Sequence, residues 1–275
     1  MQPPKQVIVS ELFPILLEEL LSLLRNLSEE EWTRATICLP WSVKDICLHL
    51  LGGDFSNLSW KRDGFSIFSE IASYEHLVQL VNEHNAHWVA NMQHLSPKLL
   101  IDTLKFTGEQ VTEYFQSLDP LKSGVPVDWV SSAPAPVWLD LAREYTERWH
   151  HQQHIRDAIN KPGLKEAKFL GPVLDTFILA LPRTYKDVIV KEEIAININT
   201  SGNIHRDWVL SYQSNQWILC EGFVENPKAS LFIDSDLLWR VFTKGISVED
   251  AKNQSKLSGD KKIAEKLLET ISIIA

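Results

Sequence analysis

The sequence has few cysteines and no dense run of basic residues, and each of these absences removes a class of protein. Its 275 residues include three cysteines, and none of them forms a Cys-x-x-Cys pair, which argues against a disulfide framework and against a thiolate zinc site. We interpret Cys38, Cys47 and Cys220 as packing residues. The formal net charge is −9, and no run of Lys and Arg could follow a phosphate backbone, so we expect no nucleic-acid partner.

Long apolar runs are also missing. No segment approaches the roughly 20 apolar residues that a bilayer-spanning helix needs. The opening residues, MQPPKQVIVSELF, lack the apolar core and the cleavage pattern of a signal peptide. We therefore expect a cytoplasmic protein that is not inserted in a membrane.

Apolar residues as a class are abundant. They make up 44% of the chain, and ten of them are tryptophan, which indicates a globular protein with a substantial core. A length of 275 residues allows one large domain or two smaller ones.

The segment 144–160 carries more chemistry than any other part of the sequence. It contains no proline or glycine and predicts a long helix. Glu147 and His151 stand four residues apart on that helix, so their side chains lie about 40° apart and can reach the same bound atom. A carboxylate and an imidazole at this spacing suit a divalent metal such as zinc, whose catalytic sites usually have three protein ligands.

His49 is the best candidate for the third ligand. It lies in segment 41–54, where a helical projection places apolar residues on every side, so the sequence predicts a buried helix. An imidazole in those surroundings costs free energy unless a partner satisfies it, and a metal would do so. Cys47 projects about 200° away from His49 and is not expected to share its metal.

The spacing alone fits a second interpretation, a solvated helix face. The apolar stripe of the same helix lies opposite Glu147 and His151, as it would if these two residues faced water. The stripe consists of Trp138, Leu141, Ala142, Tyr145, Trp149 and Ile159.

Helical periodicity and capping signals organise residues 1–162 as a bundle of four main helices. Ser28 with Glu31 predicts a capping box, Ser42 with Asp45 predicts the start of the buried helix, and Ser96 precedes a proline at another start. We expect five helical segments, among them the four main helices, over 7–26, 41–54 with a continuation to 66, 74–94, 96–117 and 144–160. Four prolines in segment 119–136 predict a loop, and Lys161-Pro162-Gly163 ends the last helix.

Residues 163–275 show a different pattern, that of a small α+β domain. Alternating or β-branched segments predict strands over 192–199, 207–212, 217–220 and 230–233. Helices are expected over 169–180, 234–245 and 259–271. The fold class is therefore α+β overall, a helical bundle followed by a small α+β domain.

Two motifs resemble the DinB-type four-helix bundle of the mycothiol-dependent maleylpyruvate isomerase family. The first is a Trp-Thr/Ser-Val-x-Asp helix start followed by a metal histidine. The second is Glu-x-x-x-His followed closely by Asp-Ile/Leu-Arg-x-Ala. They are matched here by Trp41, Ser42, Val43, Asp45 and His49, and by Glu147, His151, Ile155, Arg156 and Ala158.

The resemblance implies that His49, Glu147 and His151 are metal ligands. It also implies a sterol-carrier-like fold for residues 163–275. Many members of the family carry an aspartate where this chain has His154, which brings no fixed negative charge. Asp45 and His154 are candidates for hydrogen-bonding to the ligands without binding the metal themselves.

The family's activity implies a function in thiol chemistry. A metal with an open position deprotonates a coordinated thiol, and in the family the thiol is mycothiol. We expect a divalent metal, with Zn²⁺ the first candidate, a low-molecular-weight thiol such as mycothiol, and a small electrophile, acted on by an isomerase or a thiol transferase. A site in a cleft between the two domains would take a carboxylate-bearing substrate through Arg240 or Arg206.

A second hypothesis belongs to another class. The chain would be a metal-binding protein without turnover, whose C-terminal domain binds an apolar ligand or a protein partner. The thiol, the electrophile and the oligomeric state stay open, and the ligand set also suits iron, nickel or manganese.

Overall fold

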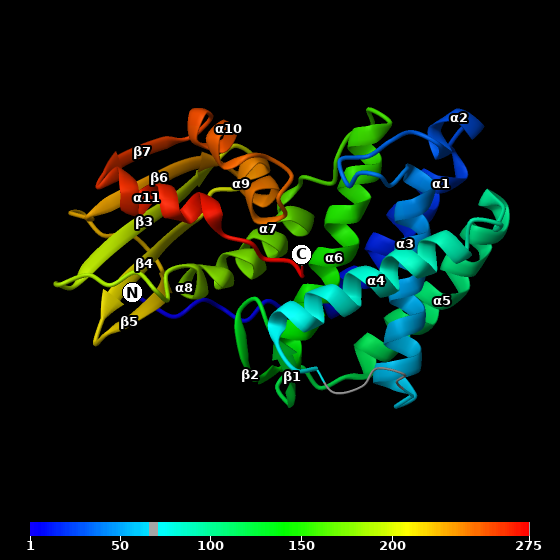
Figure 1. The fold of residues 1–275 in the computed structure, drawn as a ribbon, viewed down its shortest axis with the longest axis horizontal. Coiled ribbons are helices and arrows are strands. Elements are labelled where there is room, and N and C mark those ends of the chain that lie inside the picture. Colours follow the sequence, from blue (N-terminus) through cyan, green and yellow to red (C-terminus); the bar gives the residue numbers. More distant parts are fainter. Residues whose placement is uncertain (66–70, 275) are drawn as a thin grey trace. The chain divides into compact units, whose positions relative to one another are not determined.

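The structure is a computed structural model that describes residues 1–65 and 71–274. Its described residues form two compact units (Figure 1). The helical unit comprises Val9–Leu121 and Glu144–Leu164, and the sheet unit comprises Met1–Ile8, Lys122–Arg143 and Lys165–Ile274. The long helix α6 (Val137–Ala158) begins in the sheet unit and continues in the helical unit. The domain boundary predicted between residues 162 and 163 stays a prediction.

The helical unit consists of the second part of α6 together with α1 (Phe13–Arg25) and four helices that begin after a serine cap. Ser28, Ser42, Ser73 and Ser96 each accept a hydrogen bond from the backbone N–H three residues later. The two predicted capping boxes or caps at Ser28 and Ser42, and the predicted start at Ser96, are confirmed. The helices are α1 (Phe13–Arg25), α2 (Glu29–Trp32), α3 (Val43–Ser56), α4 (Tyr74–Asn91) and α5 (Pro97–Ser117), with a 3-10 turn at Ser10–Leu12.

Helix α3 lies at the centre of the core of this unit. It packs against α4 and α5, and α1 packs against α5. Its apolar side chains from Val43 to Leu51 are buried on every side, as predicted, together with leucines of α1 and α5 and with Ile155 of α6, while Phe55 near its end is exposed. The predicted continuation of α3 to residue 66 is a π-helical segment, Asn57–Arg62, and residue 66 lies outside the described residues.

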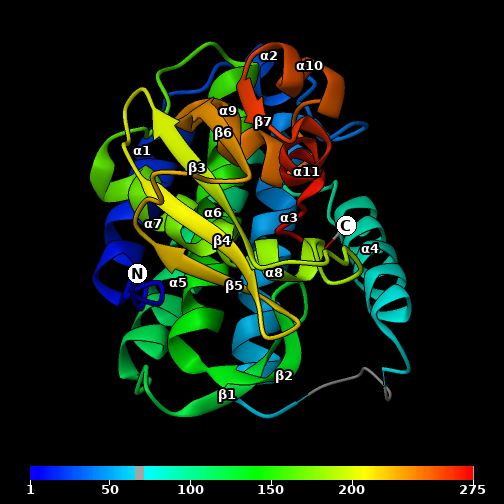
Figure 2. The ribbon, with the colours of Figure 1, turned by 90° about the vertical axis from the view of Figure 1, so that its left-hand side faces the viewer.

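The sheet unit contains a five-stranded sheet in the order β5-β4-β3-β6-β7 (Figure 2). Its central pair, β3 (Ile194–Ser201) and β6 (Ala229–Asp234), is parallel, and the other neighbours are antiparallel. The four predicted strands are confirmed as β3, β4 (Asp207–Gln213), β5 (Gln216–Glu221) and β6. The edge strand β7 (Lys256–Gly259) was not predicted.

One face of the sheet is covered by helices of the same unit. Helix α9 (Ser235–Phe242) contacts β3 and β6, α8 (Leu181–Thr184) contacts β5, and α11 (Lys261–Glu265) contacts β6 and β7. Along β6, Leu231 and Ile233 are buried while Phe232 between them is exposed, the alternation of a sheet with one covered face. The unit also contains α7 (Ala167–Phe177), the 3-10 turns Ile178–Ala180 and Lys266–Glu269, and α10 (Val248–Asn253).

Two sequence predictions about secondary structure are wrong. Segment 119–136 is not simply a loop, because β1 (Ser123–Val127) and β2 (Ser131–Pro136) form an antiparallel hairpin. Prolines are tolerated there because each strand of a two-stranded sheet has an unpaired edge that needs no donor. The predicted helix 259–271 is shorter, since β7 ends at Gly259 and α11 passes into a 3-10 turn at Lys266.

In the part of the chain that the structure describes, no helix combines the length and the apolar character required to cross a bilayer.

Candidate metal centre

His49, Glu147 and His151, the three predicted ligands, come together within the helical unit. His49 lies in the middle of α3, and Glu147 and His151 lie one turn apart on α6. The Nε2 atom of His49 is 3.0 Å from Glu147 Oε1, and the Nε2 atom of His151 is 3.2 Å from the same oxygen. One ligand atom from each residue therefore falls within 4.8 Å of the other two.

The surroundings of this group shift the pKa values of Glu147 and His151. Both imidazoles are buried, and the rings of His49 and His151 lie 4.7 Å apart. Burial acts to raise the pKa of the Glu147 carboxyl, but the charge of His151 and hydrogen bonds from His151 and His49 outweigh it and hold this pKa well below the usual range. Burial lowers the pKa of His151, against the opposing effect of Glu147.

These residues fit a divalent metal. Two imidazole nitrogens and one carboxylate oxygen form a ligand set of catalytic zinc sites, and metal binding requires a neutral imidazole and an ionised carboxylate. The pKa shifts of Glu147 and His151 favour those two states. The Nδ1 atoms of His49 and His151 are buried and have no hydrogen-bond partner among the described residues.

His150, for which the sequence indicates no partner, lies against this group. Its Nδ1 atom donates a hydrogen bond to the Thr146 carbonyl at 2.8 Å, and its Nε2 atom is 4.0 Å from Glu147 Oε2. Burial is the main reason why the pKa of His150 is lowered to about 3, so the ring is neutral at pH 7. Its position four residues after Thr146 on a polar helix gave no signal that it is buried.

Asp45 acts first as a helix cap. Its Oδ2 atom accepts hydrogen bonds from the backbone N–H and the hydroxyl of Ser42, and Gln93 donates to its Oδ1 atom. No hydrogen bond between Asp45 and His49 occurs among the described contacts. The supporting role of Asp45 behind His49 stays a prediction.

His154 lies near the ligands and next to a cysteine that we had interpreted as a packing residue. It is 4% exposed, and its ring centre is 5.4 Å from that of His151. Its Nδ1 atom is 3.1 Å from the Sγ atom of Cys38. A role for His154 in supporting the ligands stays a prediction, while its contact with Cys38 could not be read from the sequence.

The two arginines considered for substrate binding both belong to the sheet unit. Arg240 lies 3.5 Å from Asp236 and stacks over the Trp239 ring at 4.4 Å. Arg206 forms a two-bond ion pair with Asp175 at 2.9 and 3.1 Å. Both guanidinium groups therefore have acidic partners, and a role in binding substrate stays a prediction.

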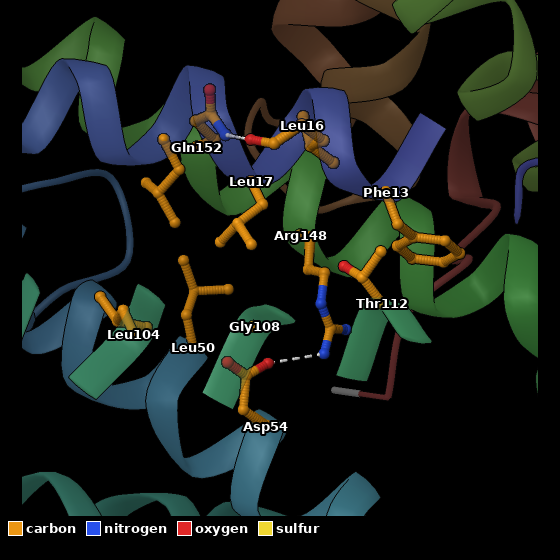
Figure 3. A pocket seen from close by; sticks show the side chains of 11 residues that line it. Phe13, Leu16, Leu17, Leu50, Asp54, Leu104, Gly108, Thr112, Arg148 and Gln152 are labelled. Atoms are coloured by element: carbon orange, nitrogen blue, oxygen red, sulfur yellow. Dashed lines mark hydrogen bonds and ion pairs between the residues drawn. The ribbon is translucent and has the colours of Figure 1, made fainter. Parts of the chain in front are cut away.

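Most of the polar face of α6 is buried, although the Glu147 side chain is 34% exposed, so this face is not the solvated one of the second interpretation. Arg148, the residue after Glu147 on α6, forms ion pairs with Asp54 at 2.9 Å and with Glu144 at 2.6 Å. Lys61 also pairs with Glu144, at 3.2 Å. Figure 3 shows Asp54 and Arg148 beside a cavity of about 30 Å³, which has room for a water molecule or two and not for an organic ligand.

Comparisons with known proteins agree with this architecture. The sequence model of the mycothiol maleylpyruvate isomerase N-terminal domain matches residues 13–156. A crystal structure of the mycothiol-dependent maleylpyruvate isomerase matches with a TM-score of 0.52 and 10% identity, over 84% of this chain and 86% of that chain. A histidine-to-alanine mutant of that enzyme matches with a TM-score of 0.54 and 9% identity, over 90% and 91%. No curated protein matches the sequence.

At these identities the solved structures establish the fold, and the domain match covers more than half of the chain. It includes all three candidate ligands and the helices that carry them. The chain belongs to the mycothiol maleylpyruvate isomerase family.

Proposed function

We propose that this protein is a metal-dependent enzyme of thiol chemistry, an isomerase or a thiol transferase, in which His49, Glu147 and His151 hold a divalent metal, with Zn²⁺ the first candidate. The observation that carries the proposal is the convergence of two Nε2 atoms on one carboxylate oxygen, at 3.0 and 3.2 Å. Family membership supports the choice of a low-molecular-weight thiol such as mycothiol as cosubstrate.

A divalent metal in this position would favour the thiolate form of a bound thiol, and so supply a nucleophile at neutral pH. The protein's own contribution is to keep the ligands in the states that bind. The pKa of Glu147 is lowered, against the effect of burial, by the charge of His151 and by hydrogen bonds from His151 and His49. Burial lowers the pKa of His151.

Neighbouring side chains hold the ligands in place. The ring of Trp41 lies 5.0 Å from that of His49, and the ring of His150 lies 4.2 Å from that of His151. His150 is in turn fixed by its hydrogen bond to the Thr146 carbonyl. A neutral His150 beside the Glu147 carboxylate adds no proton that could compete with a metal for the carboxylate.

A carboxylate-bearing electrophile such as a maleylpyruvate-like compound is the substrate class that the family suggests. Arg240 is our candidate for binding its carboxylate, and it would have to leave or share its contact with Asp236. Asp236→Asn weakens the contact with Arg240. Its effect on the KM of the electrophile distinguishes an Arg240 that binds the substrate carboxylate from one that has only a structural role.

Metal content and turnover test the proposal in two steps. We expect wild-type protein to bind zinc, and His49→Ala to bind about one equivalent less while keeping its helical circular dichroism. His94→Ala, a substitution at an exposed histidine of the same unit, is the matched control and should bind as the wild type does.

The second step is a screen of thiols, mycothiol among them, against maleylpyruvate-like and halide electrophiles. Turnover that needs both metal and thiol, and that His49→Ala loses, would support the enzyme. Metal binding without turnover would favour the non-catalytic alternative, in which the sheet unit binds an apolar ligand or a protein. A wild type that takes up no zinc, nickel, iron or manganese would contradict both.

A further inference from the structure

A second group of metal-binding side chains lies beside the first in the helical unit. Cys38, His151 and His154 each offer one ligand atom, and these three atoms lie within 4.8 Å of one another. Cys38 precedes α3 in the chain, whereas both histidines lie on α6. His151 therefore belongs to two groups, one with Glu147 and one with Cys38.

The Cys38 thiol is held as a neutral group in this environment. Burial, and then the negative charge of Glu147, raise its pKa to about 11. The sulfur lies 3.1 Å from His154 Nδ1, within hydrogen-bond distance for sulfur. A thiol with this pKa is a poor nucleophile at neutral pH, but a metal can displace its proton. The short distance from Cys38 Sγ to His154 Nδ1 is the observation that joins Cys38 to this group.

His151 has a nitrogen available to a second partner. Its Nε2 atom lies against Glu147 Oε1 at 3.2 Å. Its Nδ1 atom is buried and has no hydrogen-bond partner among the described residues. A buried polar nitrogen without a partner costs free energy, so a ligand at Nδ1 would remove a penalty that the fold otherwise carries.

We propose that Cys38, His151 and His154 form a second metal position, for a metal that favours sulfur, such as Zn²⁺, adjacent to the position at His49, Glu147 and His151. The donor set is one thiolate and two imidazoles, which is softer than the set with Glu147. On binding, the Cys38 proton leaves to solvent. If both positions were filled, the His151 ring would also lose its N–H proton to solvent and would offer one nitrogen to each metal.

The distances allow this with a small adjustment. Zinc bonds of about 2.3 Å to sulfur and 2.0 Å to nitrogen, at a tetrahedral angle, separate the two ligand atoms by about 3.5 Å. The Cys38 Sγ to His154 Nδ1 distance is 3.1 Å. For this pair a side-chain shift of about half an ångström is enough, and the ligand atom of His151 lies within 4.8 Å of both.

Cobalt titration of the full-length protein tests the position without any assay of activity. Co²⁺ takes zinc sites, and a thiolate ligand gives it a charge-transfer band in the near ultraviolet that imidazole and carboxylate do not give. We expect two equivalents of Co²⁺ to bind to wild-type protein, one of them with this band. Cys38→Ser should lose the band and about one equivalent, and keep the other equivalent.

Glu147→Gln separates this inference from the proposed function, because it removes a ligand of the first position only. We expect it to lose about one equivalent and to keep the band, so either position can fail without the other. Cys220→Ala, a change in β5 of the sheet unit, is the matched thiol control and should change neither quantity.

Two results would overturn the second position. One is a wild type that binds Co²⁺ without a thiolate band. The other is a band that survives Cys38→Ser in protein with unchanged circular dichroism. His154→Gln provides an independent check, since it should also lose the band and one equivalent while leaving the thiol in place.

Discussion

Gly52 sets how closely two helices of the helical unit approach each other. A Cβ atom at this position would lie 2.8 Å from two atoms of the Trp88 ring. That ring is held in place because its Nε1 atom donates a hydrogen bond to the Leu48 carbonyl at 2.8 Å. We expect Gly52→Ala to lower the free energy of unfolding by about 1–3 kcal/mol, as overpacking does, in a urea titration.

Gly53 is the matched control for that substitution. It is the next residue of the same helix, and an added Cβ would meet nothing within 4 Å. Because alanine favours the helix more than glycine does, Gly53→Ala should be neutral or raise the free energy of unfolding by up to about 1 kcal/mol. Equal effects of the two substitutions would show that helix propensity, and not contact with Trp88, decides both.

Some residues of the candidate site could be predicted from the sequence and others could not. Helical spacing suggested Glu147 with His151, and the buried helix suggested His49, but it was the family resemblance that predicted the set of three. Cys38 lies between α2 and α3, where no period relates a residue to its distant neighbours. His150 was missed because helical spacing does not tell which faces of a polar helix become buried.

Among the helices, α6 combines many polar side chains with deep burial. Arg148 is central to this, because it pairs with the carboxylates of Asp54 and Glu144, and Thr107 donates to Asp54 at 2.8 Å (Figure 3 shows the pair with Asp54). Removing the Arg148 cation would leave the negative charges of two buried carboxylates less well neutralised. We expect Arg148→Leu to lower the free energy of unfolding at pH 7 by about 3–5 kcal/mol in a denaturant titration.

The pH dependence of that loss follows from the sign of the Asp54 shift. Burial raises the pKa of the Asp54 carboxyl, and Arg148 and Thr107 oppose this only in part. The folded state therefore takes up the proton at a higher pH than the unfolded state does, and ionised Asp54 costs stability above the unfolded pKa. Without Arg148 this cost grows, so the deficit of the variant should shrink as pH falls from 7 towards 4.

An exposed ion pair supplies the control for this helix-level prediction. Lys98 and Asp102 lie one turn apart on α5 at 3.4 Å, with the lysine side chain 90% exposed. Such pairs contribute about 0–1 kcal/mol, so Lys98→Leu should change stability little at any of these pH values. A loss in Arg148→Leu as small as that would mean that water reaches Asp54 and Glu144 in the folded protein.

Secondary structure was predicted well wherever a local rule decides it. Serine caps marked the starts of α2, α3 and α5, and alternation marked β3 to β6. The β1–β2 hairpin was missed because prolines oppose strands in general and are tolerated only at unpaired edges, which a sequence does not mark. Strand β7 has four residues, too short to show alternation, and it exists through its pairing with β6.

The two compact units of the molecule are not two consecutive parts of the sequence, because each is built from several segments. The sheet unit draws on Met1–Ile8 and Lys122–Arg143 as well as on the C-terminal part of the chain. Within that unit, Trp129 is 2% exposed and its ring lies 6.3 Å from that of Phe177. Gln2 forms a bridge with Glu221 of β5. Local patterns could not reveal this arrangement, because these contacts join segments far apart in the chain.

A fragment of residues 1–162 tests the predicted domain boundary against this arrangement. Such a fragment keeps the helices of the helical unit and all three candidate ligands, but it separates Trp129 from Phe177 and leaves 1–8 and 122–143 without the rest of their unit. We expect it to retain helical circular dichroism, to bind a hydrophobic dye, and to show tryptophan fluorescence shifted to longer wavelength, because buried apolar surface becomes exposed. Trp129→Phe in the fragment should remove part of that shift. A fragment that binds no dye and unfolds as cooperatively as the whole chain would show that residues 1–162 form a domain by themselves, and that segment 122–143 needs the sheet for neither its folding nor its solubility.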